Sequence, residues 1–114
     1  MNYARLSDNY SVATQIQPED VGFFASEGFT TIICNRPDGE DAGQPPSATI
    51  REACEQHGIA FYMIPMQGRE LDTETVGQFL TVMGNASGPV LGYCRSGTRS
   101  AILWQVASQA PPPS

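Results

Sequence analysis

Hydrophobic side chains in this chain occur in short runs that alternate with longer amphipathic segments. Three runs are nearly continuous and rich in β-branched or aromatic residues, as is typical of strands buried on both faces; they lie at 29–34, 59–65 and 89–93. A further short extended segment is expected at 10–16. Helical patterning and terminator residues predict helices over 17–28, 47–58, 73–87 and 98–109. Turn-forming or polar residues predict loops at 35–46 and 66–72.

This alternation of strands and helices predicts an α/β fold with a mostly parallel, four-stranded sheet flanked by helices. The 114 residues suffice for one domain, which we place at 1–109, followed by a disordered proline-rich tail at 110–114. In parallel sheets, ligands bind beyond the carboxyl ends of the strands. We therefore expect three loops to meet there: those that follow Cys34 and Pro65, and the one that starts at Cys94.

Composition narrows the classes of partner. The net charge of −6 argues against nucleic acid or an anionic membrane as the main partner. Three widely spaced cysteines, the lack of a secretory leader and the lack of an apolar run of about 20 residues favour a cytoplasmic protein. The chain has six arginines and no lysine, and two of the six, Arg95 and Arg99, lie within five residues of Cys94. This local concentration of positive charge predicts a local function.

The segment VLGYCRSGTRSAIL, which spans 90–103, places Cys94 between a predicted strand and a predicted helix. Backbone amides of the loop, the positive end of the helix and the Arg99 guanidinium would together form an anion site. The same field stabilises a thiolate, so Cys94 is the candidate nucleophile. Ser100 is positioned to hydrogen-bond that thiolate. The expected anion-binding residues of the loop are Arg95, Ser96, Gly97 and Thr98. The alternative is a Cys94 that only packs in the core at a strand end.

Two further candidate site residues, Asp72 and Arg36, could instead have a purely structural role. Asp72 is the candidate general acid of a phosphatase, although it directly precedes a predicted helix and so suits an N-cap. Arg36, at the carboxyl end of a predicted strand, is expected either to reach the anion pocket or to pair with a loop carboxylate. Cys54 and His57 lie three positions apart without a second ligand pair, so no metal is expected, and no other cofactor.

The pattern Cys-x-x-Gly-x-Arg-Ser after an apolar strand resembles the phosphate-binding loop of cysteine-dependent protein phosphatases and the active loop of rhodanese sulfurtransferases. Over roughly 5–109 the chain resembles the phosphatase-like domain of the bacterial beta-lactamase hydrolase-like proteins. The segments that carry this resemblance are 11–21, 35–40, 64–68 and 89–104. It implies a dual-specificity phosphatase fold, and it suggests association with a persulfide dioxygenase-type partner, which some family members carry or are encoded beside.

Two departures from the phosphatase signature keep three functions open. That signature has five residues between cysteine and arginine, whereas four separate Cys94 from Arg99, as in the rhodanese loop. It also has histidine before the cysteine, where this chain has Tyr93. The first, which is the function we expect, is a cysteine-dependent phosphatase that acts on a small phosphorylated substrate or a phosphoprotein, and the other two are alternatives to it. The second is a sulfurtransferase that binds a sulfur oxyanion and carries a persulfide on Cys94. The third is a non-catalytic anion-binding module.

Overall fold

The computed structural model describes residues 3–109 and has five strands and four α-helices in this range. The strands are β1 (Tyr3–Ser7), β2 (Tyr10–Ala13), β3 (Thr31–Cys34), β4 (Ala60–Met63) and β5 (Val90–Tyr93). The helices are α1 (Val21–Ser26), α2 (Ser47–Gln56), α3 (Thr73–Asn85) and α4 (Thr98–Gln109). A short 3-10 turn, η1 (Pro18–Asp20), precedes α1. The predicted tail at 110–114 lies outside the described residues.

All five strands form one mixed sheet in the order β1-β2-β5-β3-β4, so β5 lies at its centre. The neighbours β2, β5, β3 and β4 are parallel, and β1 pairs with β2 in the antiparallel sense. Because the four parallel strands point the same way, their carboxyl ends meet at one edge. The α/β class and the mostly parallel sheet are therefore confirmed.

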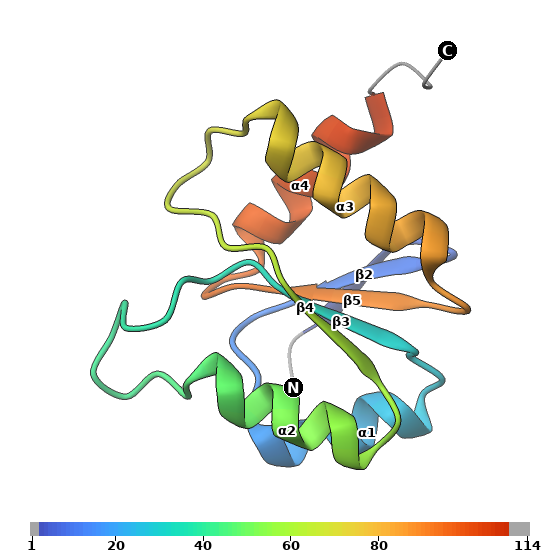
Figure 1. Ribbon diagram of the computed structural model, residues 1–114, viewed down its shortest axis with the longest axis vertical. Helices are drawn as coiled ribbons and strands as arrows, with labels where there is room; N and C mark the ends of the chain where they lie inside the picture. The colour runs from blue at the N-terminus through green and yellow to red at the C-terminus, as the bar shows by residue number, and fades with distance from the viewer. Residues whose placement is uncertain (1–2, 110–114) are drawn as a thin grey trace.

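The sheet lies between two layers of helices, with α1 and α2 on one face and α3 and α4 on the other (Figure 1). Each layer closes over its own apolar cluster. The first cluster includes Phe24, Ile32 and Ile50, and the second includes Ile33, Phe79 and Leu103. Ile32 and Ile33, which are adjacent in β3, point to opposite clusters and are fully buried. This explains why the central strands have near-continuous apolar sequences rather than alternating ones.

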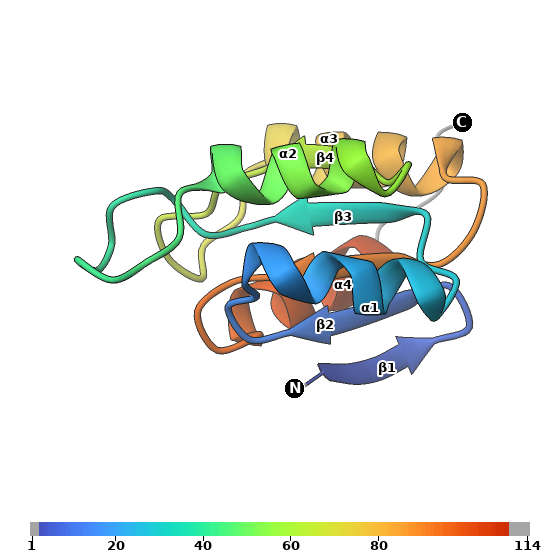
Figure 2. The same cartoon turned by 90° about the horizontal axis from the view of Figure 1, so that it is seen from below.

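Three details differ from the sequence-based expectation. The sheet has a fifth strand, β1, which runs beside β2 at one edge (Figure 2). The segment expected as a buried strand at 59–65 forms β4 at the other edge, where Tyr62 is 40% exposed because no strand lies beyond it. The helix expected at 17–28 is shorter, since η1 occupies its start and α1 ends at Ser26. Within residues 3–109, no helix is both long and apolar enough to cross a membrane.

Candidate active site

The loops that follow β3, β4 and β5 meet at the carboxyl edge of the sheet, as the sequence predicts. The backbone N–H of Asn35 donates to the carbonyl of Tyr93 at 2.8 Å, and the N–H of Met66 donates to the carbonyl of Asn35 at 2.9 Å. Arg99, in the first turn of α4, completes the junction because its Nη1 donates to the carbonyl of Met66 at 2.8 Å. Segments more than 30 residues apart in the chain are thus fixed to one another at one place.

Cys94 lies at the start of the loop between β5 and α4, beneath the chain that follows it. The backbone N–H of Gly97 donates to its Sγ at 3.1 Å. Gly97 has φ 89°, in the left-handed region that glycine adopts without strain, so the loop turns back over the sulfur here. The residue Cys94 is only 1% exposed. The loop therefore holds the thiol and also covers it.

Arg99 is held by a carboxylate that sequence reasoning did not single out. Nη1 and Nη2 of Arg99 donate to Oε2 and Oε1 of Glu40, at 2.8 and 2.9 Å. No carboxylate or carbonyl oxygen of residues 3–109 accepts from its Nε–H. The hydrogen bonds to Glu40 raise the pKa of Arg99, and Cys94 acts in the same direction, which places the thiol close to this guanidinium. The Arg99 guanidinium thus lies close to the Cys94 thiol, so an anion bound to it would lie beside the sulfur.

Arg36 lies behind this pair and does not line a cavity with the loop of Cys94. Its side chain is 4% exposed, and it donates to Glu40 at 2.8 Å, to Asp41 at 2.7 Å and to Gln15 at 3.0 Å. The structure therefore shows the carboxylate pairing that we considered as the alternative to anion binding. Hydrogen bonds from Arg99, together with the one from Arg36, lower the pKa of Glu40 from 4.5 to about 2 despite its partial burial.

Ser100 has a different partner from the one expected. Its hydroxyl donates to Oδ1 of Asn35 at 2.8 Å instead of to Cys94, and both residues are completely buried. The Nδ2 of Asn35 donates to the carbonyl of Ile64 at 2.8 Å. Ser100 and Asn35 therefore join α4 to the ends of β3 and β4. Asn35 was not predicted, although its polar side chain directly after a buried apolar strand was a usable signal.

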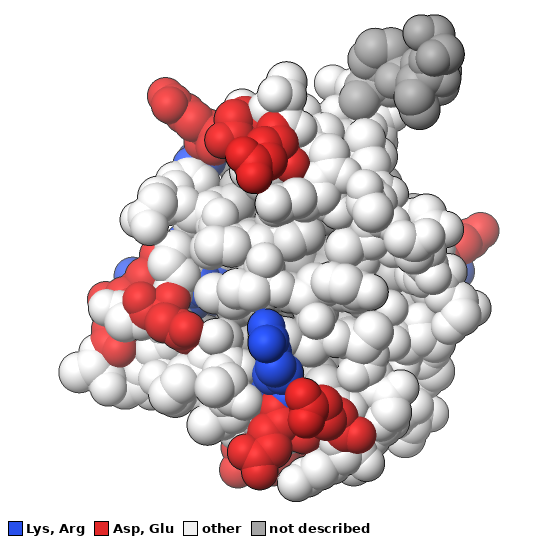
Figure 3. Space-filling view, in the orientation of Figure 1, with Lys and Arg blue, Asp and Glu red and all other residues white. Residues whose placement is uncertain are grey.

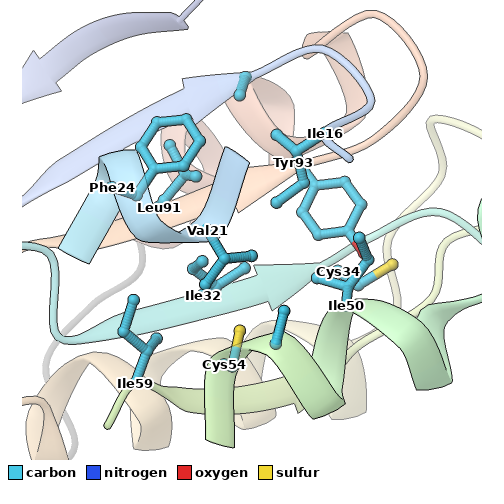
Figure 4. Close-up of a cluster of buried hydrophobic side chains, with 12 residues drawn as sticks. Ile16, Val21, Phe24, Ile32, Cys34, Ile50, Cys54, Ile59, Leu91 and Tyr93 are labelled. Carbon is cyan, nitrogen blue, oxygen red and sulfur yellow. The ribbon is translucent and has the colours of Figure 1, made fainter. Parts of the chain in front are cut away.

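Tyr93, which stands where the phosphatase signature has histidine, faces away from the loop. Its ring lies in the apolar cluster under α1 and α2, with its hydroxyl end toward Cys34 (Figure 4). Burial raises the pKa of both Tyr93 and Cys34. Burial also raises the pKa of Cys54 to about 12. These two cysteines therefore remain protonated thiols, and Cys94 is the candidate nucleophile among the three.

Asp72 caps a helix. Its Oδ1 accepts a hydrogen bond from the backbone N–H of Thr75 at 2.8 Å, and this bond lowers the pKa of Asp72. Asp72 lines a cavity with Leu71 and Val76, and this cavity is not the one that Arg99 lines. A lowered pKa and this position both oppose proton donation at Cys94 in the observed conformation.

An open hollow of about 500 Å³ adjoins the loop of Cys94. Its lining side chains are mostly polar or charged; they belong to Glu40, Asp41, Gln67, Arg69, Arg95, Ser96, Thr98 and Arg99. Of the expected anion-binding residues, Arg95, Ser96 and Thr98 line it. Gly97 lines a separate cavity that Val12 and Ala13 also border, and Arg36 lies behind Glu40 and Asp41. Within residues 3–109, no group of three or more histidine, cysteine or acidic side chains is placed to hold a metal ion.

A three-layer α/β fold with a thiol between the central strand and a helix, and an arginine in the first turn of that helix, defines a phosphatase-like domain. The family described as "Beta-lactamase hydrolase-like protein, phosphatase-like domain" matches residues 2–111, and the chain belongs to this family. A beta-lactamase hydrolase-like protein of Agrobacterium fabrum is 32% identical over 104 residues, which cover 91% of this chain and 24% of that protein. A beta-lactamase hydrolase-like protein of Xylella fastidiosa is 27% identical over 107 residues, which cover 94% of this chain and 25% of that protein. The chain thus spans about a quarter of these relatives.

Solved structures show the same fold. A candidate phosphatase from Neisseria meningitidis is 37% identical, with a TM-score of 0.82 over 94% of this chain and 78% of that one. The catalytic core of a PP-IP phosphatase from S. cerevisiae has a TM-score of 0.70 at 15% identity, and the match covers 95% of this chain and 65% of that one. At that identity the likeness shows the fold alone, which is the phosphatase-like fold of the dual-specificity type.

Proposed function

We propose that this chain is a cysteine-dependent phosphatase for phosphate monoesters. The Cys94 thiolate attacks phosphorus, so that an S–P bond forms while the P–O bond to the alcohol breaks. Arg99 and the loop amides bind the non-bridging oxygens. Water then hydrolyses the phosphocysteine, which releases phosphate and returns the thiol. The single observation that supports this best is the Arg99 guanidinium, which two hydrogen bonds to Glu40 fix close to Cys94.

The attack requires access to the sulfur. Because Cys94 is 1% exposed, the loop at 95–98 has to move outward when the phosphoryl group enters. The N–H of Gly97, which now points at the sulfur, would then be free to bind a phosphoryl oxygen. Ser100 does not share this movement, since its hydroxyl is fixed to Asn35. In this proposal Ser100 is a positioning residue for the helix that carries Arg99.

The alcohol oxygen that leaves phosphorus needs a proton, and the supply of that proton decides which phosphate esters react fastest. Glu40 is a poor proton donor, since its pKa is about 2, and Oδ2 of Asp41 accepts a hydrogen bond from Arg36. Asp72 as the acid stays a prediction, and it would require its loop to move. We therefore propose that aryl phosphates, whose leaving oxygens need little protonation, react faster than alkyl phosphates.

The test is hydrolysis of p-nitrophenyl phosphate across mildly acidic to neutral pH. We expect turnover by the wild type, none by Cys94→Ser, and near-normal turnover by the matched control Cys54→Ala. Arg99→Lys keeps the charge but loses the planar pair of donors, so kcat/KM should fall on the order of a hundredfold. Arg51→Lys is its control, because Arg51 lies on α2, over the ring of Phe61, and does not line the hollow. Equal rates for the wild type and Cys94→Ser would contradict the proposal.

A second candidate is an anion-binding module without turnover, which the burial of Cys94 favours. It predicts that phosphate binds the wild type and Cys94→Ser equally well while neither hydrolyses aryl phosphates. The length of the loop favours the remaining candidate, sulfur transfer. Transfer of sulfur from thiosulfate to cyanide, absent in Cys94→Ser, would support it. Whether the natural substrate is a small molecule or a phosphoprotein, and the association with a persulfide dioxygenase-type partner, stay predictions.

A further inference from the structure

The hollow beside Arg99 collects positive charge in a chain of net charge −6. Three of the six arginines line it, and Arg36 lies directly behind it. In the space-filling view, charged atoms of both signs gather on the side toward which the loops after β3 and β4 extend (Figure 3). A single phosphoryl group held by Arg99 would fill only a small part of the roughly 500 Å³.

Two of the arginines that line the hollow, Arg69 and Arg95, make few contacts with other residues of the chain. Arg69 forms no hydrogen bond or ion pair with any other residue of 3–109. The side chain of Arg95 is 70% exposed, and its nearest acidic group is Asp41, at 3.6 Å from Nε. Arg99 differs, because it is 13% exposed and bound to Glu40 and Met66. The guanidinium groups of Arg69 and Arg95 are therefore free to bind an anion from solution.

The acidic groups around the hollow do not cancel this charge. Both oxygens of Glu40 accept hydrogen bonds from Arg99, and Oε1 also accepts one from Arg36. Asp41 Oδ2 accepts from Arg36 at 2.7 Å. Glu70, the neighbour of Arg69, does not line the hollow. Four guanidinium groups thus face two carboxylates, and the surplus of positive charge lies on the outer rim.

We propose that the substrate is a small organic bisphosphate, with one phosphate at Cys94 and Arg99 and a second, non-reacting phosphate at Arg69 and Arg95. This inference rests on the phosphatase function proposed above and names its substrate class. The second phosphate gains charge-assisted hydrogen bonds from two exposed guanidinium groups, which already extend into solvent and need not be uncovered.

The test compares two phosphonates that the enzyme cannot hydrolyse, phenylphosphonate and 1,3-phenylenebisphosphonate, by titration calorimetry with the wild-type chain. We expect the bisphosphonate to bind about tenfold more tightly, the gain typical of one added charge-assisted contact. The double variant Arg69→Gln/Arg95→Gln should reduce this advantage to about twofold or less, because it weakens the binding of the bisphosphonate more than that of phenylphosphonate. Arg5 lies on β1 and forms an exposed ion pair with Asp8. Arg5→Gln therefore is the control for net charge, and it should still bind the bisphosphonate more tightly than phenylphosphonate.

Equal affinities of the wild type for the two compounds would overturn this inference, and so would failure of both to bind. A loss of the advantage in Arg5→Gln of the same size as in the double variant would also overturn it, since the effect would then reflect net charge. The two proposals fail separately. Cys94-dependent hydrolysis of p-nitrophenyl phosphate without a bisphosphonate preference leaves the phosphatase function standing. A bisphosphonate preference without any hydrolysis removes that function and leaves a binding site for two anions.

Discussion

The Glu40 carboxylate and the Arg99 guanidinium, 59 positions apart in the chain, form two parallel hydrogen bonds of 2.8 and 2.9 Å. Such a bidentate pair fixes the plane of the guanidinium as well as its position. Arg36 binds the same carboxylate from the buried side, so Glu40 is itself fixed. The orientation of Arg99, the proposed anion-binding arginine, therefore depends on the loop that carries Glu40.

Glu40→Gln tests this dependence. The substitution keeps the size of the side chain, removes its charge and leaves only one oxygen to accept hydrogen bonds. We expect kcat/KM for p-nitrophenyl phosphate to fall about tenfold or more, because Arg99 loses its fixed orientation toward the substrate. Glu52→Gln, on the exposed surface of α2, is the matched control and should retain full activity. Unchanged kcat/KM in Glu40→Gln would show that Arg99 is oriented without this carboxylate.

The same carboxylate gives stability a pH dependence. Its pKa is lowered from 4.5 to about 2 in the folded chain, so its contribution to the free energy of unfolding is fully present above pH 4.5. The contribution is lost as pH falls through about 2. Urea unfolding at about pH 6 and about pH 3 should show a smaller drop in stability for Glu40→Gln than for the wild type. Equal drops would mean that Glu40 is not held as a carboxylate in solution.

Ser100→Ala tests the buried contact between α4 and the end of β3. The variant leaves Oδ1 of Asn35 without its donor at a fully buried position, so the free energy of unfolding should fall by about 1–3 kcal/mol. Ser108→Ala removes a hydroxyl from the exposed side of the same helix and should cost at most about 0.5 kcal/mol. Urea denaturation of both variants measures the difference. Similar costs would show that Asn35 finds another donor, such as water.

Asp72→Asn separates helix capping from proton donation, because asparagine caps helices about as well as aspartate but cannot supply a proton. The observed hydrogen bond to Thr75 predicts that stability stays within about 0.5 kcal/mol of the wild type. We also expect kcat/KM for an alkyl phosphate to stay within about twofold, since the lowered pKa makes the carboxyl a poor acid. A large loss with the alkyl substrate, and little with p-nitrophenyl phosphate, would identify Asp72 as the general acid.

Sequence patterns were sufficient where local chemistry sets the structure. The apolar run at 89–93 forms β5, and Thr98 begins α4 as expected, which places Cys94 in the loop between them. Gly58 follows the end of α2 with φ 70°, as its predicted role of terminator requires. These features depend on neighbours in the chain, so the sequence displays them directly.

Features that depend on distant partners were missed or remained ambiguous. Glu40 lies in a segment recognised as a loop, but its partner Arg99 is 59 positions away. Asn35 and Ser100 are 65 positions apart. Strand β1 has mostly exposed side chains and no apolar run, and it forms because β2 offers a free edge and Tyr3 packs on Phe24 and Phe29. No local pattern encodes such contacts, because each needs the folded chain to bring its partners together.

The central place of β5 in the sheet determines which parts of the chain unfold locally and which only unfold with the whole domain. Its amides bond to strands on both sides, and all four of its residues are buried, so their hydrogen exchange should require global unfolding. The segments that carry Glu40 and Arg69 are exposed loops, whose amides should exchange through local fluctuations. Cys94, the proposed nucleophile, is thus anchored to the most protected strand, while the groups proposed to select the substrate lie on segments that can rearrange without disturbing it.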